Sequence, residues 1–464
     1  MTPAVVIRAP DRRTSELAWV CEVLIGRWLG LSYRIEPHAG DDVELQAGGG
    51  RVGWPDAFFA QADSRWLQPD SLPAMPARTW AMPDGLVRQR IGQASLPCLF
   101  GDGRFESGPG RIRLPIDITG SAFFLLSRYE EAVAGAPADR HGRFPGTAST
   151  AHRAGWALRP LVDEWLELLW WAIQQVAPQL QRRRREPRIW VSCDVDAPYS
   201  PGVKGPGPAL RQAASDLVNH RSPPQAARTL LNAVASQFGV TRYDPFDTFD
   251  WMLDTIERAG HRATFFFLSV RQPARIDGCY ELDEPRVAEL MRKIVQRGHE
   301  IGLHGSYASV DAPERLAAEL NDLRAAVARA GGSQDRFGAR QHYLRWRADD
   351  TARMLDGLGL AYDSTLGFPD IAGFRCGTCH EFPLFDLPGR QALAIIERPL
   401  VLMEATVISA TYLRLGLGDA ARAVMTGLRE SCRRFGGEFS LLWHNSNFGP
   451  PAARELYEEL IQPL

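Results

Sequence analysis

The 464-residue sequence has few cysteines and little net charge, and each of these excludes a class of protein. Its seven cysteines are odd in number and scattered along the chain, which argues against a disulfide framework and fits a reducing compartment. Its 53 basic and 55 acidic residues give a formal net charge of -2. Because no strong field of one sign results, we expect no nucleic acid or anionic membrane as a partner.

The sequence also has little that resembles a targeting or membrane segment. The first residues, MTPAVVIRAPDRRTSELAWV, contain no basic start followed by an uninterrupted apolar core, so we expect no secretory signal. The most apolar helix candidate, residues 17–31, is interrupted by Glu22 and Arg27 and is too short to span a bilayer. We therefore predict a cytoplasmic protein without a transmembrane segment. The sequence does not indicate whether the protein is a monomer or an oligomer.

What is present is the composition of an ordinary globular chain of two domains. Apolar residues make up 45% and charged residues 23%, and the length exceeds that of one typical core. Apolar spacing predicts a helix over residues 160–177, followed by the polar run QRRRREPR. We place the domain boundary there, which predicts a separate N-terminal α+β domain (1–185), of unknown role, and a C-terminal domain (186–464).

Strand and helix patterns alternate in the C-terminal domain. Predicted strands lie at residues 189–191, 262–269, 299–304, 360–362, 394–396 and 439–443, with helical spacing over 249–260, 287–295 and 316–327. Repeated strand–helix units indicate a parallel sheet with helices outside. About seven units suit the α/β class and a (β/α) barrel, in which chemistry lies at the C-terminal strand ends.

Polar residues collect at those predicted strand ends. They are Asp194, Asp196, His304, Arg340, His342, Tyr343 and His444. Carboxylates and imidazoles with an open coordination position are the ligands of a hydrolytic metal site. A metal-bound water loses its proton near neutral pH. One aspartate would then bind the metal, while the other, oriented by an arginine, takes the proton.

The order of the motifs resembles that of a known family. SCDVDAP, ATFFFL, GHEIGLHGS, RQHY and LLWHNS resemble the motifs of polysaccharide deacetylases of the chitooligosaccharide deacetylase type, carbohydrate esterase family four. YDSTLGF and GFRCGT resemble a subgroup with an N-terminal domain of unknown role. That domain often contains stretches like FFLLSRYEE and DRHGRF, both present here at residues 123–131 and 139–144. The resemblance therefore extends over most of the chain, and it implies a distorted (β/α) barrel for the C-terminal domain.

The resemblance also implies catalytic roles. Asp194 would be the general base and Arg340 would hold it. The backbone around Tyr343 would help to stabilise the oxyanion. His444 would protonate the departing amine.

The implied metal site departs from the family at one position. Asp196 and His304 would be two ligands of a zinc ion or another divalent metal. The family usually places a second histidine four residues after the first, where this chain has Ala308. We take His342 as the candidate third ligand and consider His299 less favoured, because it precedes the strand.

These features favour one function and leave two alternatives. The first reading is a metal-dependent hydrolase that removes an N-acetyl group from an amino sugar in glycan or surface-polysaccharide biosynthesis. One alternative is an amidohydrolase that acts on a non-sugar C–N bond, with a small-molecule amide as substrate. The other is a catalytically inactive, glycan-binding pseudoenzyme, since Ala308 replaces a ligand.

Two further features carry weaker expectations. Cys376 and Cys379, in CGTC, have the spacing of a zinc or redox pair, but the sequence has no second such pair. We interpret this pair as structural, with His380 as a less favoured third ligand. Trp346, near the predicted site, is a candidate for stacking on a sugar ring.

Overall fold

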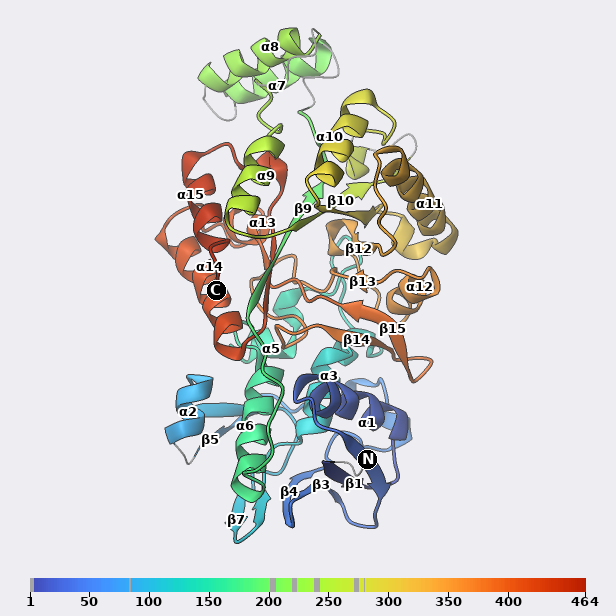
Figure 1. Cartoon of the computed structure of the whole chain (residues 1–464), viewed down its shortest axis with the longest axis vertical. Helices are drawn as coiled ribbons and strands as arrows, with labels where there is room; N and C mark the ends of the chain where they lie inside the picture. The colour runs from blue at the N-terminus through green and yellow to red at the C-terminus, as the bar shows by residue number, and fades with distance from the viewer. Residues whose placement is uncertain are drawn as a thin grey trace. The chain divides into compact units, whose positions relative to one another are not determined.

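The computed structural model describes residues 4–82, 85–200, 206–218, 223–237, 243–270, 275–278 and 280–464 (Figure 1). Two units are distinguished by their internal contacts. The first comprises Met1–Arg188, Leu344–Leu402 and Gly427–Phe439, and the second comprises Ile189–Tyr343, Met403–Thr426 and Ser440–Leu464. Each unit thus combines segments far apart in sequence. The division into domains 1–185 and 186–464 stays a prediction.

The first unit contains a six-stranded mixed sheet in the order β2-β1-β3-β4-β8-β7. Its strands are β1 Val5–Ala9, β2 Tyr33–Pro37, β3 Asp42–Ala47, β4 Gly50–Pro55, β7 Glu106–Gly108 and β8 Arg111–Arg113. The β3–β4 hairpin turns at Gly48 and Gly49, whose φ angles of 58° and 86° favour glycine at both positions. The pairs β1–β2 and β4–β8 are parallel and the others are antiparallel.

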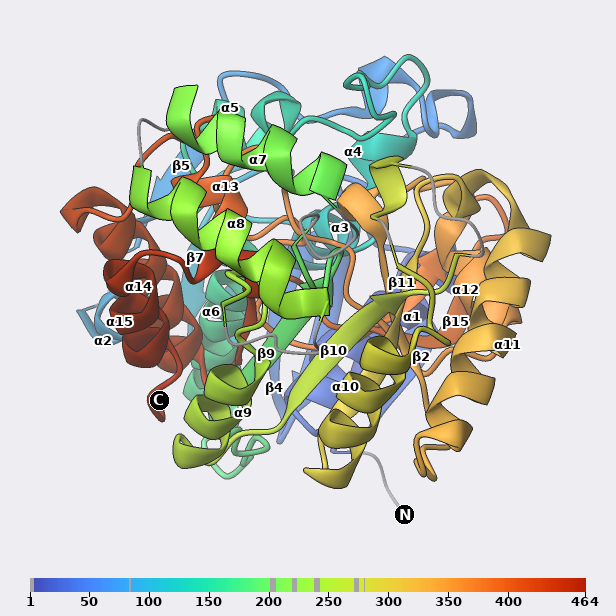
Figure 2. The same ribbon diagram turned by 90° about the horizontal axis from the view of Figure 1, so that it is seen from above.

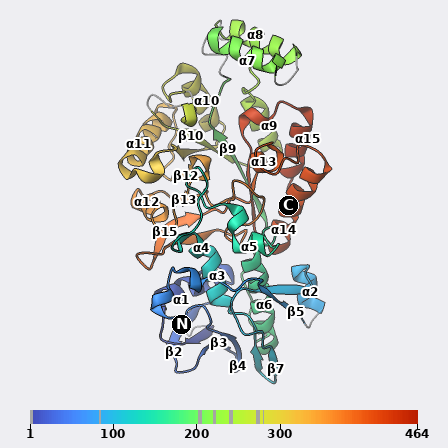
Figure 3. The same ribbon diagram turned by 180° about the vertical axis from the view of Figure 1, so that it is seen from behind.

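Helices cover this sheet and supply its core. The predicted helix over 160–177 is confirmed as α6 Leu161–Val176, which packs on β4 and β8. Its apolar stripe, including Trp165 and Leu169, is fully buried. Helix α1 (Thr14–Cys21) packs against α3 (Ile118–Leu126), as Figure 3 shows.

The remaining elements of the first unit are short. They are β5 Arg78–Ala81, β6 Ser95–Cys98, α2 Gly85–Ile91, α4 Tyr129–Ala132, α5 Thr150–Arg153, α12 Thr351–Gly357, β13 Tyr362–Asp363, β14 Phe382–Asp386 and β15 Gln391–Glu397. Strand β15 pairs in parallel with β13 and antiparallel with β14. The predicted strand at 394–396 corresponds to β15, whereas the strand predicted at 360–362 begins two residues later.

The second unit contains the strand order β12-β11-β10-β9-β17. The strands are β9 Arg188–Val195, β10 Ala263–Leu268, β11 Glu300–Gly305, β12 Gly338–Gln341 and β17 Glu438–Leu442, and β9 to β12 pair in parallel. Helices α9 Phe249–Arg258, α10 Pro285–Gln296 and α11 Pro313–Arg329 alternate with them. This confirms the predicted α/β class; the strands belong to a sheet curled into half a barrel, and a separate N-terminal domain is present.

Burial explains why these strands are central. All six residues of β10, ATFFFL, are buried, which is typical of a parallel strand covered on both faces. Helices α10 and α11 pack on β11 and on each other, and Figure 2 shows them side by side. The apolar face of α10 includes Val287, Leu290 and Ile294, as the sequence spacing predicts. Gly298 follows this helix with a φ of 74°, the left-handed conformation that ends many helices.

The second unit also contains helices that the sequence pattern did not predict. They are α7 Pro206–Val218, α8 Pro223–Gln237, α13 Glu404–Ile408 and α15 Pro451–Leu460. A further helix, α14 Asp419–Phe435, continues into the first unit. The short strand β16, Leu402–Met403, directly precedes α13. Helices α7 and α8 form an antiparallel pair in all three views. Among the helices described, none is both long and apolar enough to cross a membrane.

A buried ion cluster joins distant segments of the first unit. Both carboxylate oxygens of Glu131 accept hydrogen bonds from Arg375, at 2.7 and 2.9 Å, and Oε1 also accepts one from Arg128 Nε at 2.8 Å. All three side chains are at most 2% exposed. Burial alone would raise the pKa of Glu131, but the Arg375 and Arg128 guanidinium groups hold it below its ordinary value.

We expect Glu131→Gln to lower the free energy of unfolding by about 3 kcal/mol at pH 7, because it leaves two buried guanidinium groups without their shared counter-charge. Since the folded-state pKa of Glu131 is depressed, this stabilisation is present above its ordinary pKa of 4.5 and is lost as the pH falls. Denaturant unfolding at several pH values should therefore show the two proteins converging in acid.

The control for this measurement is Glu430→Gln, which removes a half-exposed pair with Arg433. We expect a change below about 1 kcal/mol there. An equal loss for both variants, or a Glu131→Gln loss that does not depend on pH, would contradict the assignment.

Candidate active site

The carboxyl ends of neighbouring parallel strands bring the predicted residues together. Asp194 of β9 lies opposite Phe266 of β10, and His304 of β11 lies opposite Arg340 of β12. Asp194 and Asp196 are two residues apart, so an extended chain directs both side chains to one face. The carboxylate pair therefore faces the same edge of the sheet as the histidine.

Asp194 is held by a buried arginine. Arg340 Nη1 donates to Asp194 Oδ1 at 2.7 Å and to Ser192 Oγ at 2.9 Å. The guanidinium carbon lies 4.5 Å from the ring centroid of Phe266, which limits where it can move. Because Asp194 and Arg340 are both almost fully buried, each supplies the counter-charge that the other requires.

Asp196, His304 and His342 form a group whose ligand atoms all lie within 4.8 Å of one another. Asp196 Oδ1 is 3.2 Å from His304 Nε2 and 3.6 Å from His342 Nε2. The two imidazole rings contact each other at a centroid distance of 4.9 Å. The structure thus brings together the three residues predicted as metal ligands.

The hydrogen bonds of this group fit a divalent cation. Nδ1 of His304 lies 2.8 Å from the carbonyl oxygen of Arg340, and Nδ1 of His342 lies 3.1 Å from Asp277 Oδ1. Both Nε2 atoms are thereby left toward Asp196, as in histidines that bind metals. Asp196 Oδ1 is buried and, within the described part of the chain, accepts no well-formed hydrogen bond. A carboxylate and two imidazole nitrogens are a donor set for zinc and similar ions.

The charges of the group are consistent with an ionised Asp196. Burial raises the pKa of its carboxyl, but His342, His304 and His444 together lower that pKa well below its ordinary value. Burial lowers the pKa of His304, but Asp194 and Asp196 raise it overall. The Asp196 side chain remains 37% exposed, so this group is open to solvent on one side.

Two other positions that the sequence raised lie outside the group. Ala308 is exposed at the start of the turn Ser309–Asp311. His299 accepts a hydrogen bond from the backbone N of Ala263 at 3.1 Å, and its Nε2 lies 3.0 Å from Glu257. Both ring nitrogens of His299 are thus occupied at the amino end of β10.

His444 approaches the carboxylates from a different segment. Its Nε2 is 3.7 Å from Asp196 Oδ2, and its Nδ1 is 2.7 Å from Oε1 of Glu404. The same oxygen of Glu404 accepts hydrogen bonds from the His444 backbone N and from Asn447. Burial lowers the pKa of His444, but Glu404, followed by Asp196, raises it to about 10. The ring is therefore protonated at neutral pH and can donate a proton.

Tyr343 has an unusual backbone conformation. Its φ and ψ are 64° and 12°, in the left-handed region, and the following Leu344 also has a positive φ. Such a conformation is uncommon for a residue other than glycine and persists where the surroundings hold it. The Tyr343 ring packs against His342 at 4.7 Å and Tyr307 at 5.4 Å. This turn therefore fixes the backbone next to the metal-ligand group.

The sequence reasoning missed two carboxylates of the site. Glu404 directly follows the short strand β16, so it meets the same strand-end criterion as Asp194. Asp277 lies in an isolated helical turn, and its Oδ1 also accepts the backbone N of Tyr307. The sequence carries no signal for Asp277; only the structure shows that its neighbour Gly278 approaches the site, since a Cβ atom there would lie 2.1 Å from the carbonyl oxygen of Asp196.

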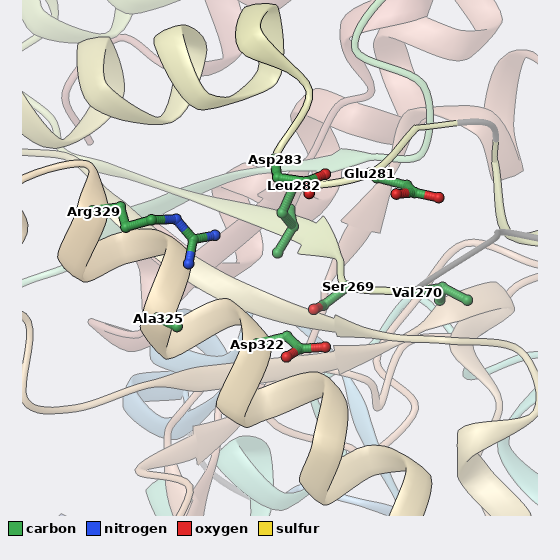
Figure 4. A pocket seen from close by; sticks show the side chains of 8 residues that line it. All are labelled: Ser269, Val270, Glu281, Leu282, Asp283, Asp322, Ala325 and Arg329. Carbon is green, nitrogen blue, oxygen red and sulfur yellow. The ribbon is translucent and has the colours of Figure 1, made fainter.

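A pocket of about 510 Å³ lies elsewhere in the second unit (Figure 4). Its lining comes from the end of β10, from the segment before α10 and from one face of α11, namely Ser269, Val270, Glu281, Leu282, Asp283, Asp322, Ala325 and Arg329. None of these belongs to the group described above. The expectation that Trp346 stacks on a sugar is wrong for this structure, because the side chain is buried and only 5% of the residue is exposed.

Comparisons with known families match two parts of the chain. Residues 244–360 match the model of the polysaccharide deacetylase family. Residues 5–178 match a family of unknown function, DUF7033. The comparison with curated proteins gave no match.

Several solved structures are similar to this chain. A protein from Mycobacterium smegmatis, assigned as a polysaccharide deacetylase, is 18% identical with a TM-score of 0.39 over 60% of this chain and 83% of that one. A protein from Pseudomonas aeruginosa PAO1 with the same assignment is 16% identical, with a TM-score of 0.36 over 60% of this chain and 84% of that one. The PuuE allantoinase is 14% identical, with a TM-score of 0.36 over 60% of this chain and 83% of that one.

Proposed function

We propose that this chain, in which residues 244–360 form a polysaccharide deacetylase domain, removes an N-acetyl group from an amino sugar. The observation that carries the proposal is the group of Asp196, His304 and His342 beside an aspartate fixed by Arg340. These three residues would hold a divalent cation, zinc by donor type. When bound, the ion would promote ionisation of water and polarise the amide carbonyl.

Asp194 is the proton acceptor in this proposal. Its Oδ1 is committed to Arg340, whereas Oδ2 lies 3.7 Å from His304 Nε2 and faces the proposed ligand group. A carboxylate held in one orientation can accept the proton of the attacking water as the oxygen bonds to the amide carbon. Arg340 acts through Asp194 as a positioning residue, because its buried guanidinium group fixes the orientation of that carboxylate through a hydrogen bond of 2.7 Å.

His444 is the proton donor. Its pKa of about 10 keeps the imidazolium charged near neutral pH, and Glu404 fixes the ring through Nδ1. Nε2 therefore carries the transferable proton on the side of Asp196. When the C–N bond breaks, this proton goes to the departing nitrogen, which leaves acetate and a free amine.

The turn at Tyr343 would stabilise the oxyanion that forms during attack. Its backbone is held in a left-handed conformation next to His342. A backbone N–H held rigidly in this way can donate to developing negative charge without reorganisation. We assign this role to the backbone around Tyr343 and not to its hydroxyl group.

We infer that the substrate belongs to glycan or surface-polysaccharide biosynthesis. Acetate release from N-acetylhexosamine derivatives, including nucleotide-linked and oligomeric forms, would support this function. Release of product only from small non-sugar amides would replace it with a general amidohydrolase. Glycan binding without any turnover of metal-loaded protein would replace it with a binding protein.

We expect His342→Ala to lower the bound metal by one equivalent per chain and His299→Ala to leave it unchanged. The reason is that His342 directs Nε2 toward Asp196, whereas both nitrogens of His299 are engaged with Ala263 and Glu257. Elemental analysis of both purified variants measures the content, and melting curves verify that they are folded. The reverse pattern would discard His342 as the third ligand.

We expect Asp194→Asn and His444→Gln each to lower kcat by roughly 10²–10⁴-fold, the usual contribution of a positioned acid or base. Bound metal should be retained in both variants, since neither residue belongs to the proposed ligand set. Initial rates of acetate release at several substrate concentrations separate kcat from KM.

The matched control is Asp283→Asn, which removes a carboxylate from the pocket of Figure 4 and should leave kcat unchanged. A large loss in this control together with near-normal rates for Asp194→Asn would place the chemistry in that pocket instead.

A further inference from the structure

A second group of metal-ligating side chains lies in the first unit. Asp163, Cys379 and His380 are all buried, and their ligand atoms lie within 4.8 Å of one another. Asp163 comes from the first turn of α6, while the other two come from the loop before β14. The group shares no residue with the candidate active site.

Asp163 organises the loop through both carboxylate oxygens. Oδ1 accepts a hydrogen bond from Thr378 Oγ1 at 2.7 Å. Oδ2 accepts from the backbone N of Cys379 at 3.0 Å and from its Sγ at 3.2 Å. The carboxylate and the sulfur are therefore adjacent, and the local backbone holds them there.

A second thiol completes the group. Cys432, on α14, lies next to Cys379: the backbone N of Gly437 donates to the Cys432 carbonyl oxygen at 2.9 Å, and the backbone N of Glu438 donates to that of Cys379 at 2.8 Å. Both cysteines are buried and neither forms a disulfide. A Cβ atom at Gly437 would lie 2.2 Å from Cys379 Sγ, so glycine at this position is what allows the sulfur to occupy the site. The sequence spacing suggested Cys376 as the partner of Cys379, whereas the structure supplies Cys432.

His380 lacks the hydrogen bonds that a buried imidazole needs. The residue is only 2% exposed, and in the described parts of the chain Nδ1 has no hydrogen-bond partner. Nε2 lies 3.9 Å from Asp163 Oδ1, and Nδ1 lies 3.6 Å from Glu438 Oε2, both beyond hydrogen-bond length. Burying a polar nitrogen without a partner is costly. With an ion between Nε2, the Asp163 carboxylate and the Cys379 sulfur, Nδ1 would carry the ring proton and face the Glu438 carboxylate.

The surroundings offset the charge of such a site. Two thiolates and one carboxylate around a divalent ion leave a net charge of one minus. Arg185 is partly buried and interacts electrostatically with Glu438, Asp163 and Cys379. Glu438, opposite Nδ1 of His380, would orient the ring as outer carboxylates do for metal-binding histidines.

We propose that Asp163, Cys379, His380 and Cys432 form a closed, structural zinc site in the first unit. Two sulfurs, one imidazole and one carboxylate are a zinc donor set, and four protein ligands leave no position for a substrate. Binding releases the protons of Cys379 and Cys432, because the thiolate is the ligand. Cys376 is not included, since its charged surroundings are Glu397 and Arg128.

Cobalt substitution of the full-length chain tests this site separately from the candidate active site. The chain is stripped of metal and then titrated with Co²⁺. Only a thiolate ligand gives an intense near-ultraviolet sulfur-to-cobalt charge-transfer band, and the active-site group contains no cysteine. We expect the band in the native chain, in Asp196→Asn and in the matched cysteine control Cys376→Ser.

We expect Cys379→Ser to weaken the band, because one of two thiolates is lost, and Cys379→Ser combined with Cys432→Ser to abolish it, with bound zinc falling from two equivalents per chain to one. A second variant, His380→Gln, tests the site if Cys379→Ser does not fold. It keeps both thiols, so we expect the sulfur band to remain while the zinc affinity falls at least tenfold. Absence of the band in the native chain, or its weakening in Cys376→Ser in place of Cys379→Ser, overturns the proposal. Loss of the band in Asp196→Asn would overturn the independence of the two sites.

Discussion

The hydrogen-bonded ion pair between Arg340 and Asp194 is the interaction on which the candidate site depends. The guanidinium group reaches from β12 across two intervening strands to a carboxylate on β9. Both groups are removed from water, so neither is tolerated alone, and the pair requires the strands to keep their register. Within the described ranges, the charged partners of the neighbouring Asp196 are His304, His342 and His444 and not an arginine, so its counter-charge comes from these rings or from a bound cation. Asp194 is paired with Arg340, whereas Asp196 faces the imidazoles, and this difference in partners makes the two aspartates chemically different.

A second level of contacts orients the imidazoles. His304 uses Nδ1 on the carbonyl oxygen of Arg340, His342 uses it on Asp277, and His444 uses it on Glu404. In each case the far nitrogen is left toward Asp196. His444 differs from the other two rings in its charge: burial lowers the pKa of His444, but the fully buried Glu404 raises it to about 10 and so favours an imidazolium. The outer carboxylates thus contribute to the chemistry without touching a substrate.

Sequence reasoning recovered the parts of this arrangement that follow from periodicity. A buried apolar run followed by polar residues located Asp194, Asp196, His304 and His444, because parallel strands end at one edge of a sheet. Asp277 and Glu404 were missed, since one lies in an isolated turn and the other follows a two-residue strand, and neither segment is long enough to show a period. The pairing of Glu131 with Arg375 spans 244 residues and leaves no local signal at all. Trp346 was misjudged because proximity along the chain does not determine exposure.

The two groups of possible metal ligands differ in the way that distinguishes catalytic from structural sites. Asp196 is partly open to solvent and shares its face with a fixed carboxylate and a protonated histidine, so a molecule bound there would meet groups able to move protons. Asp163, Cys379 and His380 are closed off, and every polar neighbour either positions the loop or balances charge. A catalytic zinc site keeps an open coordination position, where substrate can meet a neighbouring acid and base. A structural zinc site is closed, often has thiolate ligands, and holds segments of the chain together. Residue type, burial and neighbouring groups therefore separate the proposed hydrolytic group of the second unit from the proposed structural group of the first.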